Sequence, residues 1–454
     1  MFLRRLSDRS LDHYPANRQR IWYLALGLIA IITLYYEFVT LTSVAPLVQA
    51  HFHLSLQQYG YILILANILG ALAALVGSLS DRIGRANLIV LGLLVSGACT
   101  LATAQASSLW LFLVLYCGVG FLDGMMITLT VALMRDFSPR LGRAAAMGFW
   151  IVGPFAGSFL ATWVASLTLP IYHSWQSQYV IAGSIGLVMF LVCLVGLRDL
   201  SAGLRDQVME SLREKALVEA RASSIDLDAA VKHPWRQMLR PRILIIALGI
   251  NLFLLLSFGA RGFFVIFLST SFKFPLAEAN GMVSRFFVAI AISAVVVGFL
   301  SDAARVRKPF MLSGAIALII VTLLFISRIG QPTNAALMTV LLTLMGISSS
   351  LVYAPWLASF TETIESINPS LVATGSAVEV FIARWIATIA ILALPLVVGK
   401  GQGWETWWWV CVVGQILFLP TILLASGYWN PVQARAAANA REPAETSEVQ
   451  PHAG

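Results

Sequence analysis

Charged residues are scarce in this chain. Of its 454 residues, only 11% are Asp, Glu, Lys or Arg, whereas 59% are hydrophobic. Soluble globular domains carry roughly a quarter charged residues, so the chain lacks the polar shell that a soluble core of this size needs. Aromatic residues are plentiful and neither a Gly-X-Y nor a heptad repeat occurs, which excludes disordered, collagen-like and coiled-coil chains. A polytopic membrane protein remains.

Cysteines and chemical motifs are also few. The four cysteines lie far apart within apolar runs, where we expect buried free thiols rather than a disulfide framework or a metal site. The sequence has no phosphate-binding loop, no zinc-ligand spacing and no nucleophile elbow. We therefore expect no enzymatic activity, no cofactor and no metal. The net charge of +8 needs no nucleic-acid partner to explain it.

Long apolar runs dominate the sequence, and each is long enough for a membrane-crossing helix of about 20 residues. Six runs precede a polar stretch and six follow it, which predicts an all-α integral membrane protein with twelve spans. The first run is too long for the apolar region of a signal peptide, which spans about 7–15 residues. The predicted spans are 21–47, 57–79, 87–106, 109–134, 143–168, 176–197, 242–270, 276–300, 309–327, 333–358, 371–398 and 404–426.

Lysine and arginine gather on one side of these spans. With both termini placed in the cytoplasm, 24 of the 30 Lys and Arg residues lie in cytoplasmic segments and three on the opposite side. The sequence therefore predicts a multi-pass protein of the cell (plasma or inner) membrane with cytoplasmic termini. Its predicted parts are a cytoplasmic segment (1–20), a six-helix bundle (21–197), a cytoplasmic linker (198–241), a second six-helix bundle (242–426) and a disordered tail (427–454).

The polar linker contains a stretch with helical amphipathic spacing, which predicts a surface helix. Two interpretations stay open for the linker: it lets the two halves move relative to each other, or it only tethers them.

The two groups of spans carry an internal repeat. Gly, Leu, Ser and Asp recur in register after the second span and after the eighth, with an offset of 221 residues. Two related six-span halves are the build of many transporters, whose solute site lies at their interface. The first copy reads Gly77-Ser-Leu-Ser-Asp81-Arg82-Ile-Gly84-Arg85, and the second begins Gly298-Phe-Leu-Ser-Asp302.

From Trp22 to about Gly427 the chain resembles the major facilitator superfamily, because the first copy is similar to that family's signature G-x-L-x-D-R-x-G-R. The resemblance implies two six-helix bundles, related by a pseudo-two-fold axis, around a central cavity that opens alternately to either side. It also implies a latch that joins the halves when the cavity faces outward. The alternative is a simple cationic anchor on the inner side. The expected latch residues are Gly77, Asp81, Arg82, Gly84, Arg85 and Asp302.

Six ionisable residues fall well inside the predicted spans, away from the span ends, where each costs at least about 2.5–3.5 kcal/mol at mid-membrane on insertion scales. The first half holds only acids, whereas the second half holds all three arginines and one acid. The repeat offset brings Arg261 close in depth to Glu37, so these two can pair across the cavity. The six residues are Glu37, Asp123, Arg261, Arg285, Glu379 and Arg384.

These charges predict a solute site. Arg261, Arg285 and Arg384 offer bidentate donors to a carboxylate or phosphate and stay charged at any relevant pH. An acid without a permanent partner in a low-dielectric wall can carry a proton, and Glu37, Asp123 and Glu379 are the candidates. The alternative is a set of closed ion pairs that hold helices together. Tyr35, Tyr36 and Tyr353 can line the same cavity, although aromatic packing is the default expectation.

Arg285 and Arg384 are also similar, by span and charge type alone, to a cationic pair in the oxalate:formate antiporter branch of the superfamily. We therefore expect a secondary active transporter of a small carboxylated metabolite, working by proton symport or anion exchange. Its expected partners are the anionic solute, protons and the lipid bilayer, and the expected state is a monomer.

A second hypothesis is a proton-driven drug or metabolite exporter. The fifth span contains Gly153-Pro154-Phe-Ala-Gly157-Ser158, which resembles an antiporter signature but fits a bend for close helix packing equally well. Three arginines within spans argue against the broad apolar cavity of such exporters. A non-transporting sensor is the third hypothesis, and the short tails leave it little support.

Overall fold

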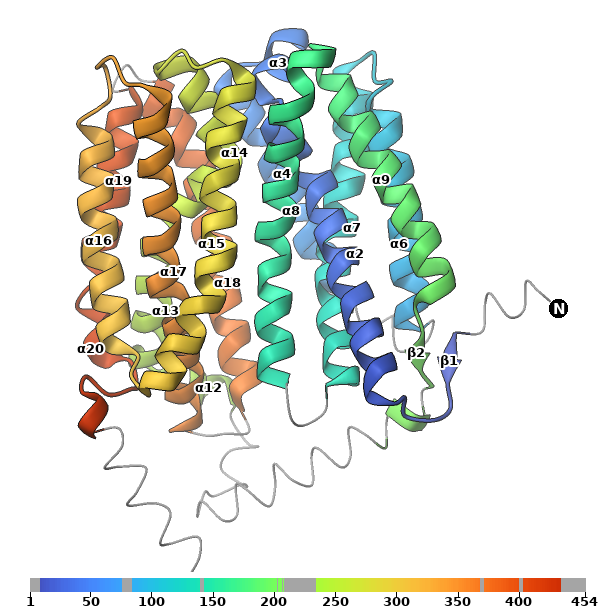
Figure 1. Ribbon diagram of the computed structural model, residues 1–454, viewed down its shortest axis with the longest axis vertical. Coiled ribbons are helices and arrows are strands. Elements are labelled where there is room, and N and C mark those ends of the chain that lie inside the picture. Colours follow the sequence, from blue (N-terminus) through green and yellow to red (C-terminus); the bar gives the residue numbers. More distant parts are fainter. Residues whose placement is uncertain are drawn as a thin grey trace, which may run out of the picture.

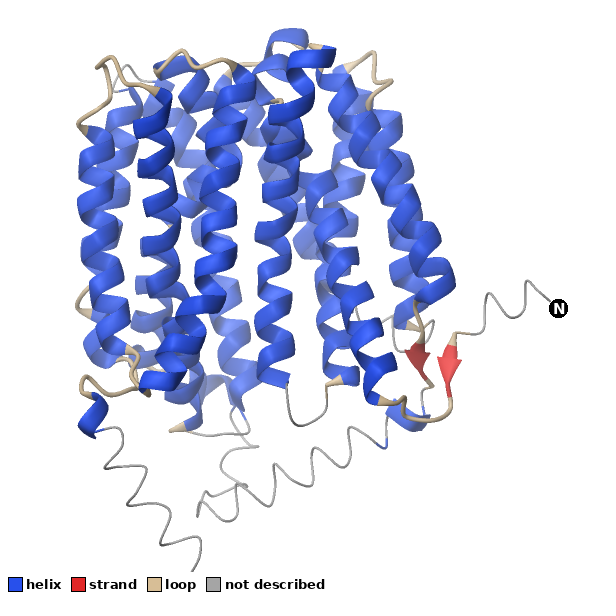
Figure 2. Cartoon of the chain, viewed as in Figure 1, coloured by secondary structure: helices blue, strands red, loops and turns tan. Residues whose placement is uncertain are grey.

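The computed structural model describes residues 9–75, 84–138, 143–201, 203–205, 207, 234–367, 371–399 and 403–433. Figure 1 shows long helices arranged side by side along one axis, and Figure 2 shows that helices make up nearly all of the described chain. The expected residues Gly77, Asp81 and Arg82, most of the linker and the end of the tail lie outside the described residues.

The described residues of the first half contain six long helices and one short one. They are α2 (Asn17–Ser43), α3 (Ala45–His51), α4 (Leu56–Leu75), α6 (Arg85–Thr103), α7 (Leu109–Phe137), α8 (Arg143–Tyr172) and α9 (Trp175–Gly196).

The second half follows the same plan, preceded by the short α12 (Pro234–Met238). Its helices are α13 (Pro241–Phe253), α14 (Leu255–Ser271), α15 (Leu276–Ala304), α16 (Lys308–Ile326), α17 (Ala335–Glu365), α18 (Val372–Val397), α19 (Gly403–Phe418) and α20 (Thr421–Leu424).

Eleven helices of the described chain are long and apolar enough to cross a membrane. The predicted seventh span is formed by α13 and α14, which meet at Leu254, where ψ is 1°. Three residues earlier, the Asn251 amide donates to the carbonyl of Ala247, and side chains that bond to the preceding turn often bend helices. The prediction of an all-α membrane protein built from two six-span halves is confirmed.

Small residues let the helices of the first half approach closely. A Cβ on Gly124 of α7 would overlap the carbonyl oxygen of Gly70 on α4. A Cβ on Gly157 of α8 would lie 2.6 Å from Cβ of Tyr35 on α2. Gly153 likewise faces α2, at Ile31. The Gly-Pro pattern of the fifth span therefore serves close helix packing.

The start of α2 and the short helix α20 lie at the same end of the helices, which we name the terminal side; the opposite end is the far side (Figure 1). The two hydrogen bonds between described residues that join the halves lie in the far-side half of the helices. The Tyr59 hydroxyl donates to the Gly262 carbonyl at 2.9 Å. The Asn280 amide donates to the Ser43 carbonyl at 2.8 Å.

The helices α8 and α15 pack against each other across the two halves. They lie side by side at the far side and diverge toward the terminal side (Figure 1). The halves are therefore held together at the far side and splayed at the terminal side.

Two short strands pair at the terminal side of the first half, which the all-helical prediction did not include. Strand β1 (Ser10–Leu11) lies parallel to β2 (Asp199–Leu200), with Ser10 opposite Asp199. The buried Arg9 fixes this arrangement by donating to Asn87 Oδ1 at 2.8 Å and to the Leu194 carbonyl at 3.3 Å. A pairing of two residues leaves no periodic signal in a sequence.

Candidate functional site

Asp123 near the middle of α7 lies within electrostatic range of two arginines of the second half. Both Arg384 on α18 and Arg261 on α14 act electrostatically on its carboxylate. Neither arginine forms an ion pair with Asp123 in the described part of the chain, and Asp123 Oδ1 is buried without a hydrogen-bond partner there. We name Asp123, Arg261 and Arg384 the central cluster. Its residues come from both halves and interact electrostatically at mid-helix depth, without a hydrogen bond or ion pair between these described residues.

The two guanidinium groups keep their hydrogen-bonding capacity. Arg261 lies over the ring of Phe155 on α8, with 5.1 Å from Cζ to the ring centroid. This cation–π contact positions the charge without neutralising it. Within the described ranges, the guanidinium groups of Arg261 and Arg384 form no hydrogen bond or ion pair, and both side chains are partly exposed. The N–H groups of both guanidinium groups can therefore donate hydrogen bonds to an anion at this depth.

Two tyrosines border the central cluster. Tyr35 on α2 interacts electrostatically with all three cluster residues and with Tyr353 on α17. Both tyrosine side chains are partly exposed, although Tyr353 also stacks on Trp356, with 6.2 Å between ring centroids. Tyr36, by contrast, is buried within the first half. Two of the three tyrosines considered in the sequence thus face the charges, and one packs in the core.

Glu379 lies on α18 on the terminal side of Arg384. Its Oε1 accepts a hydrogen bond from the Asn251 amide at 3.3 Å, across α18 and α13. It also interacts electrostatically with Tyr353. Glu379 and Arg384 form no ion pair with each other, in keeping with their spacing of five residues, about 140° around a helix. Glu379 therefore borders the central cluster without neutralising it.

Glu37 points away from the central cluster. Its side chain is only 1% exposed, and a Cβ on Gly186 of α9 would overlap its Oε1. Ser96 on α6 is also a close neighbour. The proposed pair between Glu37 and Arg261 is therefore not formed. The physical reason is that Tyr35 and Glu37, two residues apart, point about 200° apart around the helix.

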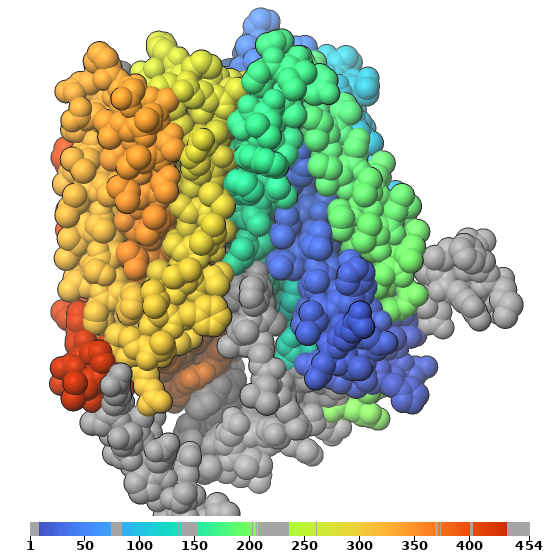
Figure 3. Space-filling view, in the orientation of Figure 1, coloured from blue at the N-terminus to red at the C-terminus, as the bar shows by residue number. Residues whose placement is uncertain are grey.

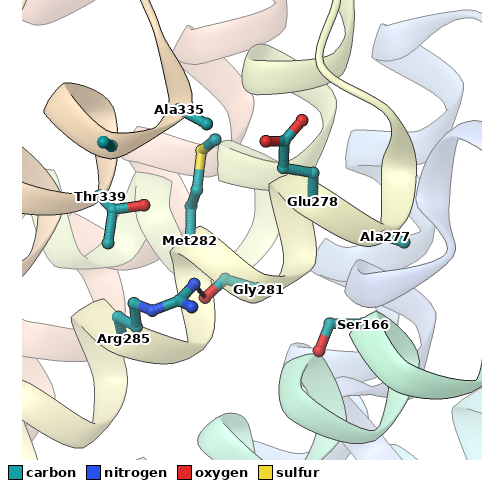
Figure 4. Close-up of a pocket in the computed structure, with 9 residues that line it drawn as sticks. Ser166, Ala277, Glu278, Gly281, Met282, Arg285, Ala335 and Thr339 are labelled. Carbon is teal, nitrogen blue, oxygen red and sulfur yellow. Dashed lines mark hydrogen bonds between the residues drawn. The ribbon is translucent and has the colours of Figure 1, made fainter.

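Arg285 also lies apart from the other two arginines. Its side chain is exposed, and its Nη1 donates to the Gly281 carbonyl at 2.9 Å on the same helix. It lines an open groove between α8, α15 and α17 (Figure 4). Asn280, which reaches the first half, is about 140° away around α15. The sequence interpretation assigned three arginines to one site. In the structure, Arg261 and Arg384 belong to the central cluster and Arg285 does not.

Each half has a group of ion pairs at the terminal-side end of its helices. In the first half, Arg85 pairs with Asp136, and Arg205 lies 3.8 Å from Asp136 and 3.4 Å from Asp199. The backbone N–H of Arg85 donates to Asp199 at 2.5 Å. Burial lowers the pKa of the nearby Arg9. We name Arg85, Asp136, Asp199 and Arg205 the first end cluster; the sequence interpretation had included only Arg85.

In the second half, Arg307 lies 2.5 Å from Asp302 and 3.2 Å from Glu362, and we name these three residues the second end cluster. Of the expected latch residues, Arg85 and Asp302 thus have partners within their own half. Gly84, at the start of α6, has φ of 93°, a backbone conformation that favours glycine. The ion pairs of each end cluster thus join residues of the same half.

The sequence matches the Major Facilitator Superfamily over residues 26–365. A galacturonate transporter from Dickeya chrysanthemi is 28% identical over 183 residues, which are 38% of this chain and 50% of that protein. A hexuronate transporter from Escherichia coli (strain K12) is 26% identical over 187 residues, 38% of this chain and 40% of that protein. The matches thus span half or less of the length of these relatives.

Solved structures share the fold. A bacterial homologue of the human lysosomal transporter Spinster, in an inward-facing and unoccupied conformation, matches with a TM-score of 0.64 and 16% identity over 93% of this chain and 96% of that one. A D-xylose–proton symporter matches with a TM-score of 0.66 and 13% identity, over 89% of this chain and 96% of that one.

Proposed function

The chain belongs to the Major Facilitator Superfamily, and we propose that it is a secondary active transporter of a small organic anion, a sugar acid of the hexuronate class. The observation that carries this proposal is the central cluster: two arginines, without ion-pair partners among the described residues, act on one carboxylate at mid-helix depth. The names of the relatives, which are galacturonate and hexuronate transporters, support the sugar-acid class.

The carboxylate of the solute binds Arg261 and Arg384, because a guanidinium group offers paired N–H donors that match a carboxylate. Hydroxyl groups of a sugar acid find donors and acceptors nearby in the partly exposed side chains of Tyr35 and Tyr353. The solute then contacts both halves, since Tyr35 belongs to the first half and the arginines belong to the second. Such a bridge gives the bound solute a direct influence on how the halves rock against each other.

Proton coupling follows from competition for the same two arginines. In the empty protein they stabilise the Asp123 carboxylate, and in the loaded protein they stabilise the carboxylate of the solute. A proton on Asp123 removes this competitor, so protonation and solute binding favour each other. This linkage supports symport with protons. Glu379 is the second candidate for a proton site, because it borders the cluster next to Asn251.

The positive-inside bias supports an orientation with the terminal side in the cytoplasm of a cell membrane. In that orientation the joined far side faces outward, and the splayed terminal side gives the solute access from within. We propose that this is the inward-facing state of a monomeric carrier.

The test is a thermal-shift titration of the purified protein with galacturonate, with galactose and with a lipophilic organic cation. Galactose is the matched neutral compound, because it has a hydroxymethyl group where galacturonate has a carboxylate. We expect stabilisation by galacturonate alone, followed by its uptake into proteoliposomes. Stabilisation by the organic cation and not by any acid would overturn the proposal and favour an exporter.

A further inference from the structure

A groove of about 340 Å³ opens on the outer face of the helices, where α8 of the first half meets α15 and α17 of the second. Figure 3 shows α8 and α15 meeting on this face of the molecule, and Figure 4 shows the groove itself. Its polar side chains are Ser166, Glu278, Arg285 and Thr339. None of them belongs to the central cluster.

The face that carries the groove is apolar along the rest of its length. On α15, Ile292 and Phe299 follow Arg285 at intervals of seven residues and are 62% and 68% exposed. On the neighbouring helices, Leu167 is 54% and Val340 is 53% exposed. Residues seven apart share one face of a helix. Arg285 therefore lies on a stripe that meets lipid.

Arg285 reaches along this stripe toward the far side. Its Nη1 donates to the carbonyl of Gly281, one turn nearer the far-side end of α15, and it has no carboxylate partner within the described residues. Long cationic side chains in a membrane extend in this way toward the polar headgroups. The guanidinium group thus keeps N–H donors for a phosphate.

Glu278 lies on the same face of α15, two turns beyond Arg285 and about 10 Å nearer the far-side end. It is exposed and forms no ion pair with Arg285. Within the groove, the guanidinium group of Arg285 therefore lies deeper in the membrane region, and the carboxylate of Glu278 lies nearer to the far-side end of the helix. A phospholipid with a primary amine has the complementary order, because its phosphate lies deeper than its ammonium group.

We propose that this groove binds the headgroup of an amine-bearing zwitterionic phospholipid from the far-side leaflet. The phosphate binds Arg285, and the ammonium group donates to Glu278. The Ser166 and Thr339 side chains border the headgroup from the two neighbouring helices. Since Ser166 belongs to the first half, the bound headgroup contacts both halves where they meet and stabilises the joined far side.

The test uses the full chain, purified in detergent and titrated with phosphatidylethanolamine, phosphatidylcholine and phosphatidylglycerol while thermal stability is followed. We expect phosphatidylethanolamine to bind most tightly, because a quaternary choline has no N–H to donate and glycerol has no positive charge. Arg285→Ala should weaken its binding about tenfold, as expected for the loss of a charge-assisted hydrogen bond. Arg328→Ala, which removes an arginine from a far-side loop outside the groove, is the control.

Glu278→Gln separates the two contacts. It should remove the preference for phosphatidylethanolamine over phosphatidylcholine while leaving phosphatidylcholine binding unchanged. If Arg285→Ala does not fold, Arg285→Lys provides the second variant and should weaken phosphatidylethanolamine binding by a smaller factor. Equal binding of the three lipids, or phosphatidylethanolamine binding unchanged by both Arg285→Lys and Glu278→Gln, would overturn the proposal.

Soluble phosphoethanolamine distinguishes a lipid from a free phosphate compound. We expect it to bind far more weakly than the lipid, since the acyl chains contribute by packing against the apolar stripe. Equal affinity for the soluble compound would assign the groove to a water-borne ligand and refute the lipid proposal. These outcomes do not depend on the solute, because none of the groove residues belongs to the central cluster.

Discussion

The central cluster and the first end cluster use the same residue types in opposite ways. In the first end cluster, Arg85 and Asp136 are in direct contact and both are buried. In the central cluster, Asp123 interacts with Arg261 and Arg384 at longer range, and neither arginine forms an ion pair. Closed pairs hold helix ends together, whereas charges left open at mid-helix depth are available to a ligand. The two clusters therefore differ in whether their opposite charges are already paired with each other.

The largest effect of a substitution is expected in the first end cluster, where the ion pair between Arg85 and Asp136 is closed. Asp136→Asn removes the partner of Arg85 in a buried ion pair, so we expect a loss of about 3–5 kcal/mol of stability. Thermal unfolding in detergent measures it. The control is Glu362→Gln in the second end cluster, whose side chain is 39% exposed, so its ion pair contributes at most about 1 kcal/mol. Equal losses in the two variants would contradict this interpretation.

The next largest effect concerns solute affinity. Arg384→Ala and Arg261→Ala each remove charge-assisted hydrogen bonds worth about 1.5–3 kcal/mol, so affinity for a sugar acid should fall roughly ten- to hundredfold. Stability should change little, because neither guanidinium group is paired. Isothermal titration of each variant and of Arg328→Ala measures the change. An affinity equal to that of the unmodified protein would remove the arginine concerned from the solute site.

Asp123→Asn tests the role of the carboxylate in the central cluster. The substitution removes the carboxylate that we propose competes with the solute and carries the proton. Uptake into proteoliposomes driven by a pH gradient should drop to the level without a gradient, while solute counterflow continues. Counterflow lost together with pH-driven uptake would indicate that Asp123 contributes to binding or folding rather than to coupling.

The smallest effect is expected for Glu37→Gln. Glu37 is enclosed between α2, α6 and α9 and faces away from the central cluster. Uptake driven by a pH gradient should therefore match that of the unmodified protein. A loss of pH-driven uptake as large as that of Asp123→Asn would show that coupling extends into the first half.

The membrane fold and the identity of the charged residues follow from the sequence. The predicted spans lie close to the observed helices; 109–134, for example, corresponds to α7 (Leu109–Phe137). The sequence predicted Gly84 and Arg85 as latch residues of the loop after the second span, and the structure places them at the start of α6, where Gly84 has positive φ. The strands at Ser10 and Asp199 and the partners Asp136 and Glu362 were missed, because contacts over long sequence separations leave no periodic pattern.

The position of each ionisable residue along its helix could be predicted from the sequence, but the direction in which its side chain points could not. Arg261, Arg285 and Arg384 all lie inside helices, as the sequence predicts, but only two of them face Asp123. Glu37 and Asp123 belong to the same half, yet one is enclosed in that half and the other faces the second half.

The sequence alone determined how many helices cross the membrane and which ionisable residues lie within them, because hydrophobic length and the cost of burying charge act residue by residue. Tertiary structure decided which of those charges meet. A change of two residues along a helix turns a side chain by about 200°, and the rotation of each helix about its axis depends on how it packs against its neighbours. That packing brings Arg384 within electrostatic range of Asp123 and leaves Arg285 exposed in a groove between α8, α15 and α17.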